Sequence, residues 1–302
     1  MSKFNCPSCG SNSTKLYVLD PVDREYFVER TVNSRYERCR NCLNLFQIPW
    51  PSIEETNTFY HKDYQNYVGV KAPFISVLFK KLQINSSKSF INEFGTSATV
   101  LDFGCNQGLF LESLFQLGCS NLHGFDVIEF TVDNKNYKYW DSLNDILESE
   151  IKFDVIRMNH VIEHLPNIDS TMIKLGKLLK TNGVIIGQTP NASHYTSRLF
   201  KSYWGPLHFP YHILLFSHKG LLVHAKKWSL ELQDTSKTLM PTGWSMSIEN
   251  IVKPIIQKKT RGRSLYYFIL ILISVPMVIF DFIFIKETAI FDFSLYKNNN
   301  KR

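Results

Sequence analysis

The 302-residue sequence lacks two features that define secreted proteins. No apolar stretch precedes Cys6, so we expect no secretory signal and a cytoplasmic location. The six cysteines do not suggest a disulfide framework, because four of them form two C-x-x-C pairs and the others are Cys105 and Cys119. The composition, 44% hydrophobic and 20% charged, also lacks the charge excess of disordered chains. We therefore expect a folded protein with one large domain and appendages.

A strongly basic body is also absent. The formal net charge is +7, but residues 251–302 carry nine Lys and Arg against three Asp and Glu, so the rest of the chain is nearly neutral. Since nucleic-acid binding depends on clustered basic side chains, we expect no nucleic-acid partner.

The two C-x-x-C pairs are Cys6 with Cys9 and Cys39 with Cys42. Four thiolates can hold a structural Zn²⁺ in tetrahedral geometry, so we predict a zinc-binding module over residues 1–50. The gap between the pairs is long, which a hairpin insertion would explain. A redox pair and unligated cysteines are the alternatives.

Residues 51–97 are predicted to form a helical lead-in. Tyr60, Tyr64 and Tyr67 recur at near-helical spacing, and residues 74–94 have the pattern of an amphipathic helix. The tyrosines suit either packing or an entry helix that closes over a ligand.

A strand, a glycine turn and a helix follow one another over residues 99–115. This order leaves free backbone N–H groups beside the carboxyl end of a strand, which suits a nucleotide-like ligand. Asp126 ends the next predicted strand and is placed to bind ribose hydroxyls. Asn106 stands where a dinucleotide fingerprint has its second glycine, which argues against a nicotinamide-dependent oxidoreductase.

Three ordered segments carry a family resemblance. Val100–Gly108 (VLDFGCNQG) resembles motif I of class I S-adenosylmethionine-dependent methyltransferases, Phe153–Asn167 is similar to their fourth strand and the segment after it, and Gly183–Asn191 is similar to the fifth strand. The resemblance implies an α/β fold with a doubly wound, mostly parallel seven-stranded sheet over residues 98–302. It also implies S-adenosylmethionine as cofactor, bound by the following residues: Asp102, Gly104, Asn106, Gly108, Asp126, Asp141 and Asn159. Asp141 could equally be the N-cap of a helix over residues 143–148.

Two histidines are candidate general bases for methyl transfer. His160 follows the fourth strand, and His212 lies in an aromatic loop where the family places its acceptor. Residues 160–164 also match the H-x-x-E-H pattern of zinc peptidases, but a strand precedes them where a helix would be required. Some related methyltransferases hold a divalent metal with E-x-x-E-H; here His160 replaces the first glutamate, and Glu163 with His164 could simply start a helix.

An apolar run over residues 265–285 is interrupted only by Ser274, Pro276 and Asp281, and a basic stretch precedes it. Its length would span a bilayer. However, the family fold needs residues 289–296 as a seventh, antiparallel strand between strands five and six, and two half-helices broken at Pro276 would be too short to cross. We favour an insertion at about 250–286 that lies on an anionic membrane surface, with a true span or a buried core or oligomer contact as alternatives.

Together these features predict methyl transfer to a hydroxyl, or a similar nucleophile, of a small-molecule, sugar or lipid-linked glycan acceptor at the inner face of the membrane. A quinone-type O-methyltransferase and a non-catalytic zinc-ribbon adaptor are the alternatives.

Overall fold

The structure, a computed structural model, describes residues 4–24, 33–60, 73–128, 136–253 and 265–297. Its largest element is a seven-stranded sheet in the order β10-β11-β8-β7-β4-β5-β6. All neighbouring strands are parallel except β11, which is antiparallel to β8 and to β10. The predicted doubly wound sheet, including the late strand inserted between the fifth and sixth, is confirmed. The strands are β4 (Val100–Phe103), β5 (Leu122–Phe125), β6 (Lys138–Trp140), β7 (Phe153–Asn159), β8 (Leu179–Pro190), β10 (Leu230–Lys237) and β11 (Ile290–Lys297).

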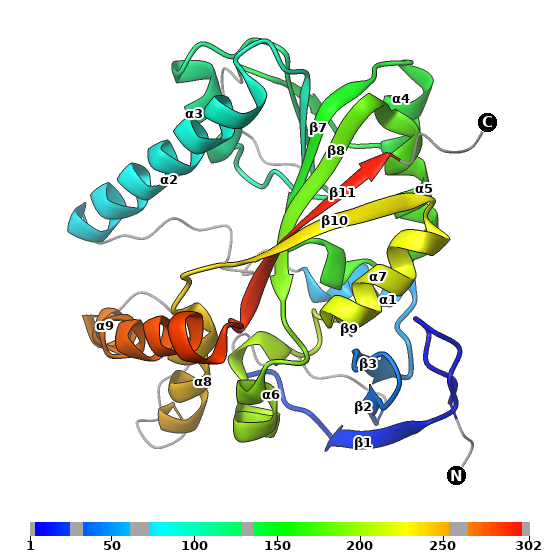
Figure 1. The fold of residues 1–302 in the computed structure, drawn as a ribbon, viewed down its shortest axis with the longest axis vertical. Helices are drawn as coiled ribbons and strands as arrows, with labels where there is room; N and C mark the ends of the chain where they lie inside the picture. Colours follow the sequence, from blue (N-terminus) through cyan, green and yellow to red (C-terminus); the bar gives the residue numbers. More distant parts are fainter. Residues whose placement is uncertain (1–3, 25–32, 61–72, 129–135, 254–264, 298–302) are drawn as a thin grey trace.

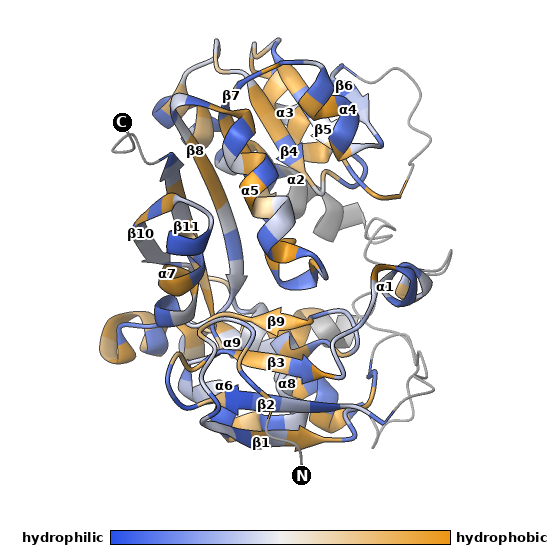
Figure 2. Ribbon diagram, turned by 90° about the vertical axis from the view of Figure 1, so that its right-hand side faces the viewer, coloured by the Kyte–Doolittle hydropathy of each residue, from blue (hydrophilic) through white to orange (hydrophobic). Residues whose placement is uncertain are grey.

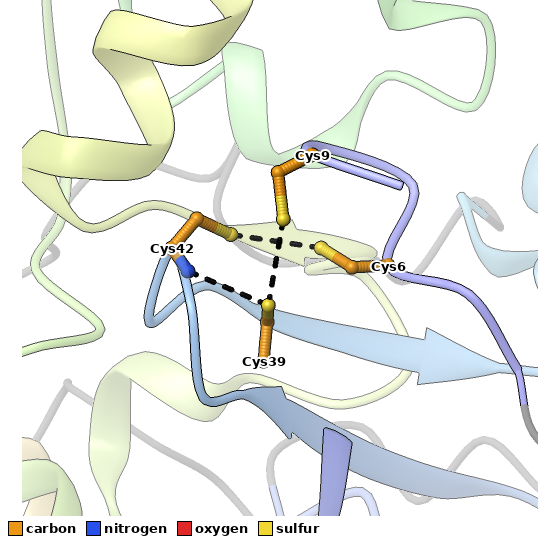
Figure 3. Close-up of side chains that lie close together, drawn as sticks. All are labelled: Cys6, Cys9, Cys39 and Cys42. Carbon is orange, nitrogen blue, oxygen red and sulfur yellow. Dashed lines mark hydrogen bonds between the residues drawn. The ribbon is translucent and has the colours of Figure 1, made fainter. Parts of the chain in front are cut away.

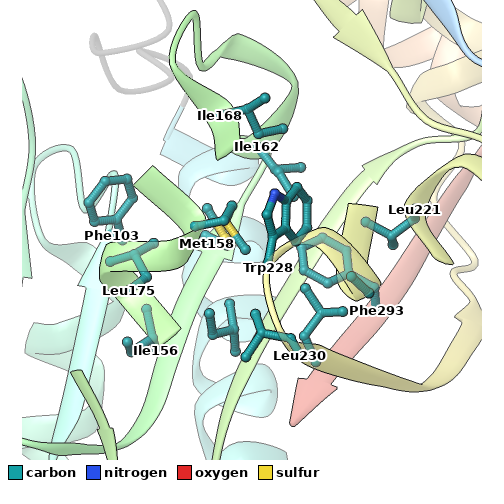
Figure 4. Close-up of a cluster of buried hydrophobic side chains, with 14 of the residues drawn as sticks. Phe103, Ile156, Met158, Ile162, Ile168, Leu175, Leu221, Trp228, Leu230 and Phe293 are labelled. Atoms are coloured by element: carbon teal, nitrogen blue, oxygen red, sulfur yellow. The ribbon is translucent and has the colours of Figure 1, made fainter. Parts of the chain in front are cut away.

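Alternating side chains build a core on each face of this sheet. Val100 faces one cluster and Leu101 faces the other, as do Val155 and Ile156, because successive side chains in a strand point to opposite faces. Helices α2 (Pro73–Phe94) and α3 (Leu109–Gln116) cover the first face. Helices α4 (Leu143–Glu148), α5 (Ile168–Leu178) and α7 (His218–Lys227) cover the second, whose core is drawn in Figure 4.

A smaller four-stranded sheet carries the cysteine pairs. It has the order β1-β2-β3-β9, with β1 (Thr14–Leu19), β2 (Arg35–Cys39) and β3 (Leu45–Ile48) from the N-terminal module. The β1–β2 hairpin accounts for the long gap between the two C-x-x-C pairs. The fourth strand, β9 (Leu214–Leu215), comes from the loop after β8 and pairs with β3 (Figure 2). The module therefore shares its sheet with the large domain.

Short helical segments connect the two sheets. In the lead-in, α1 (Ile53–Phe59) precedes α2, and Tyr64 and Tyr67 lie outside the described residues. A 3₁₀ turn, η2 (Ile162–His164), follows β7. Between β8 and β9 lie α6 (Tyr195–Phe200) and the 3₁₀ turns η3 (Lys201–Tyr203) and η4 (Gly205–Leu207).

The C-terminal apolar run forms one helix beside α8 (Thr242–Val252), away from the large sheet (Figure 1). Helix α9 (Leu265–Phe280) continues without a break through Pro276 into a π-helical turn, η5 (Asp281–Ile285). The break at Pro276 considered from the sequence is therefore absent: the helix continues past the hydrogen bond that proline removes, and it packs along α8.

Candidate functional site

The turn between β4 and α3 is built on left-handed backbone. Gly104 has φ +83° and Gly108 has φ +72°, a conformation that glycine adopts without strain. A Cβ at Gly104 would lie 2.5 Å from Cγ2 of Val161, and one at Gly108 would lie 2.1 Å from the hydroxyl of Tyr137. Only glycine fits at either position.

Asp126 ties this turn to the end of β5. Its Oδ2 accepts a hydrogen bond from the backbone N–H of Asn106 (2.8 Å), and its Oδ1 accepts one from that of Ile128 (3.1 Å). Burial raises the pKa of Asp126, while these N–H groups oppose the shift. Val127 follows with 69% of its surface exposed. An acceptor carboxylate and an exposed apolar side chain thus stand together beside the glycine turn.

Asp102 lies within the sheet, opposite Arg157 in the parallel β4–β7 ladder. The Arg157 Nη1 donates to Asp102 Oδ1 over 2.7 Å, and the guanidinium lies 4.1 Å above the ring of Phe110. Burial raises the pKa of Asp102, and the charge of Arg157 counteracts it. Arg157 was not identified from the sequence, although a basic residue between the apolar residues Ile156 and Met158 was visible there.

The two remaining predicted cofactor residues lie at neighbouring strand ends. Asn159 is the last residue of β7 and is half-buried. Asp141 is exposed just after β6. The alternative role of Asp141 as a helix cap is wrong, because the adjacent Ser142 caps α4 by accepting a hydrogen bond from the Asp145 N–H.

Both candidate bases lie around one buried carboxylate. Glu163 is fully buried, and its Oε2 accepts a hydrogen bond from the Thr189 hydroxyl (3.1 Å). Its Oε1 lies 3.5 Å from Nδ1 of His160 and 3.9 Å from Nε2 of His212. Burial alone would raise the pKa of Glu163, but the net shift is downward, and the largest lowering cause is the hydrogen bond with His160. The carboxylate is therefore ionised and favours a proton on the facing nitrogen of His160.

His164 and His212 complete the cluster. Their ring centroids are 4.6 Å apart and perpendicular, and the Tyr60 hydroxyl lies 2.9 Å from Nδ1 of His164. Burial lowers the pKa of His164 to about 3 and that of His212 well below its usual value. Both rings are therefore neutral at pH 7. Glu163, His164 and His212 each offer one potential metal-ligand atom, and these three atoms lie within 4.8 Å of one another. This set can exchange protons or hold a divalent cation. In the sequence, Glu163 and His164 fit either part of a divalent-metal motif or the start of a helix, and neither is predicted as a site residue.

The N-terminal module holds the loop that carries His212. The buried Tyr36 hydroxyl of β2 donates to the backbone carbonyl of His212 (2.5 Å). The next residue, Ile213, donates its N–H to the carbonyl of Glu163 (2.8 Å). On the ring side, Nδ1 of His212 lies 2.7 Å from the carbonyl of Pro206, so that nitrogen carries the proton, and Nε2 accepts a hydrogen bond from Nδ1 of His208 over 3.4 Å.

The four predicted zinc ligands converge at one point (Figure 3). Sulfur atoms of Cys6 and Cys42 are 3.5 Å apart, and those of Cys9 and Cys39 are 3.6 Å apart. Sulfurs around a tetrahedral Zn²⁺ at 2.3 Å would be about 3.8 Å apart, so the spacing fits the ion closely. The hydrogen bond with the Cys42 thiol lowers the pKa of Cys6 and raises that of Cys42, so the thiolate that a zinc ion requires is favoured at Cys6.

Asn44 links this centre to the large domain. Its side-chain N–H donates to the Ser8 hydroxyl (2.8 Å), and its Oδ1 accepts from the Ser217 N–H at the start of α7 (2.7 Å). Gly220 leaves room for the Asn44 side chain, since a Cβ at this position would lie 1.8 Å from the Asn44 oxygen.

Comparisons with known proteins find similarity to methyltransferases. A profile of the methyltransferase domain family matches residues 77–234. The ubiquinone biosynthesis O-methyltransferase of Rickettsia bellii is 30% identical over 117 residues, which cover 36% of this chain and 48% of the relative. The corresponding enzyme of Rickettsia conorii is 24% identical over 188 residues, covering 58% and 61%. The chain thus spans about half to three-fifths of the length of these relatives. Among solved structures, a SAM-dependent methyltransferase from Archaeoglobus fulgidus superposes with a TM-score of 0.47 at 17% identity, over 72% of this chain and 94% of that one.

Proposed function

Because the chain belongs to the class I S-adenosylmethionine-dependent methyltransferases, we propose that it methylates a hydroxyl group of a small-molecule, sugar or lipid-linked glycan acceptor. The observation that carries this proposal is the contact of Val161 with Gly104. It sets His160, the neighbouring residue, beside the glycine turn, so a base and a cofactor loop share one end of the sheet.

The residues around the turn suit the cofactor. The loop from Gly104 to Gly108 would hold its methionine part, and Asp126 would accept hydrogen bonds from the ribose hydroxyls. The buried Tyr137 hydroxyl beside Gly108 has no hydrogen-bond partner among the described residues, so a polar ligand on the turn would satisfy it. S-adenosylmethionine supplies an electrophilic methyl group at this position.

His160 would then act as the general base. With the Nδ1 proton facing Glu163, its Nε2 is free to take the proton of the acceptor hydroxyl, and the ionised carboxylate stabilises the resulting imidazolium. His212 contacts the same carboxylate and would orient the acceptor or take the proton in its place. Most of the rate enhancement would come from holding acceptor and methyl group in line.

We assign a structural role to Zn²⁺ bound by Cys6, Cys9, Cys39 and Cys42. All four positions of the tetrahedron are filled by sulfur, so the site has no open position for a substrate.

A quinone-type acceptor is the second candidate. The relatives named ubiquinone biosynthesis O-methyltransferases favour it, since a phenolic hydroxyl on a lipid would need the same base and cofactor.

The test measures methyl incorporation from labelled S-adenosylmethionine with three acceptor sets: nucleotide sugars, lipid-linked saccharides and polyprenylated catechols. We expect one set to be methylated and Asp126→Ala to weaken cofactor binding at least 100-fold. Asp145→Ala, which changes an exposed carboxylate on α4, is the matched control. Cofactor binding without methylation of any set would contradict the acceptor class, and no cofactor binding would favour the non-catalytic adaptor.

A further inference from the structure

Helix α9 and turn η5 expose a long apolar face. Large side chains on this face have 44–68% of their surface exposed, among them Ile269, Leu272, Ile273, Ile279, Ile283 and Phe284. They follow one another from Ile269 to Phe284, so the face is continuous over about 25 Å of helix. Soluble monomers rarely expose a patch of this size, which marks it as an interaction surface.

The opposite side of the helix is fixed to the body of the protein. Leu270, Ser274, Val278 and Asp281 are buried, and their spacing of three to four residues makes one stripe. Asp281, the single acid in the apolar run, is fully buried: it accepts hydrogen bonds from the Tyr195 hydroxyl (2.8 Å) and from the Trp244 indole N–H (2.7 Å). In the folded protein the run is therefore amphipathic. Asp281 faces the domain, and the opposite face is exposed and apolar.

The elements before and after the helix both belong to the folded domain. Strand β11 begins at Ile290, five residues after η5, and pairs along its length with β8. Helix α8 ends at Val252 and packs on α9. Residues 268–285 are long and apolar enough to cross a membrane. Crossing, however, would carry one end of the helix about 30 Å from the other through the bilayer, and pull the buried stripe off the domain.

Positive charge flanks this face. Lys286 is exposed directly after η5, and Lys237 at the end of β10 donates to the carbonyl of Phe282 (3.1 Å). In the sequence, Arg263 stands two residues before α9. Lys258, Lys259 and Arg261 precede it closely. Lys237 and Lys286 beside the face, and the basic residues that precede α9 in the sequence, complement an anionic lipid surface.

We propose that the apolar face of α9 and η5 docks the protein on an anionic lipid bilayer, with the helix lying in the plane of the headgroups. This docking is independent of the methyl-transfer proposal, because it requires only the surface of α9. It would bring the enzyme to an acceptor held in the same membrane.

The experiment is sedimentation of the full chain with sucrose-loaded vesicles. Vesicles of phosphatidylglycerol and phosphatidylcholine are compared with vesicles of phosphatidylcholine alone, at low salt and at 500 mM salt. The variant Leu272→Asp/Phe284→Asp changes two of the exposed side chains. Leu82→Asp/Ile173→Asp changes two exposed apolar side chains on α2 and α5 and is the matched control. Circular dichroism and zinc content verify that each variant folds.

We expect binding to the anionic vesicles that weakens at high salt, at least a tenfold rise in the half-saturating lipid concentration for Leu272→Asp/Phe284→Asp, and no change for the control. Alkaline carbonate should release the bound protein. Retention after carbonate would overturn the in-plane orientation in favour of a span. Absence of vesicle binding, with a dimer in sedimentation velocity that the α9 variant dissolves, would overturn the proposal in favour of a contact between copies of the chain.

Discussion

Tyr36→Phe tests whether the N-terminal cysteine module positions the candidate active site. The substitution removes one hydroxyl from a fully buried ring and leaves the ring in place. The centroid of this ring lies 6.3 Å from the ring centroid of Phe209. What is lost is the hydrogen bond to the backbone carbonyl of His212 (2.5 Å). The glycine turn and the four cysteines are not touched.

The expected loss of stability follows from the burial of the His212 carbonyl group that loses its hydrogen bond. Leaving one buried carbonyl without its donor costs about 1–3 kcal/mol of the free energy of unfolding. If 1–2 kcal/mol of this loosens the loop that carries His212, the ratio of molecules with the histidine in place to those with it displaced falls about 5- to 30-fold. We therefore expect kcat to fall by up to that factor, while affinity for S-adenosylhomocysteine and zinc content stay unchanged.

Tyr17→Phe is the matched control. Tyr17 lies on β1 of the same sheet and donates its hydroxyl to the carbonyl of Ser197 in α6, away from the histidines. Both variants should lose stability in denaturant titrations, but only Tyr36→Phe should lose kcat. An unchanged kcat in Tyr36→Phe, or an equal loss in Tyr17→Phe, would refute a positioning role of the module.

Three further predictions concern the histidines and the metal. His160→Gln should lower kcat about 10²- to 10⁴-fold, as expected for a lost general base, and leave cofactor affinity intact; a loss below threefold would exclude His160 as the base. Burial lowers the pKa of His194 to about 4. Between pH 6.5 and pH 4 the unfolded chain therefore binds a proton at this residue that the folded chain does not bind. As the pH falls through this window, His194 should lower the free energy of unfolding by up to about 1.4 kcal/mol per pH unit. Denaturant titrations of His194→Gln should show a shallower dependence over this window, and an identical slope would contradict the assignment. Elemental analysis should find one zinc per chain and Cys39→Ser should lose it; full zinc retention in that variant would rule out the four-sulfur site.

The arrangement of the sheet could be predicted because its signals are local. Apolar runs of strand length, glycines at a tight turn and an acid after the second strand each occupy a few consecutive residues. The late strand was placed within one residue of its observed start, since residues 289–296 alternate apolar and polar side chains. Its partners followed from the family resemblance.

The histidine cluster could not be predicted in full, because its members come from distant segments. Tyr60 belongs to the lead-in, Glu163 and His164 follow β7, and His212 lies on a loop that a strand of the zinc module holds in place. No periodicity in the sequence links these segments.

Two local errors had different causes. Asp141 and Ser142 can both cap a helix, and the structure selects Ser142. Pro276 usually ends a helix, but contact with α8 continues α9 through it, and sequence spacing does not reveal that tertiary contact.

The most direct test of the central claim is calorimetric titration of the zinc-loaded protein with S-adenosylhomocysteine, using NADH as control. We predict micromolar binding of S-adenosylhomocysteine alone, which Asp126→Ala abolishes. Binding of NADH instead, or of neither ligand, would contradict the assignment of the glycine turn as the cofactor site and remove the basis for His160 as a catalytic residue.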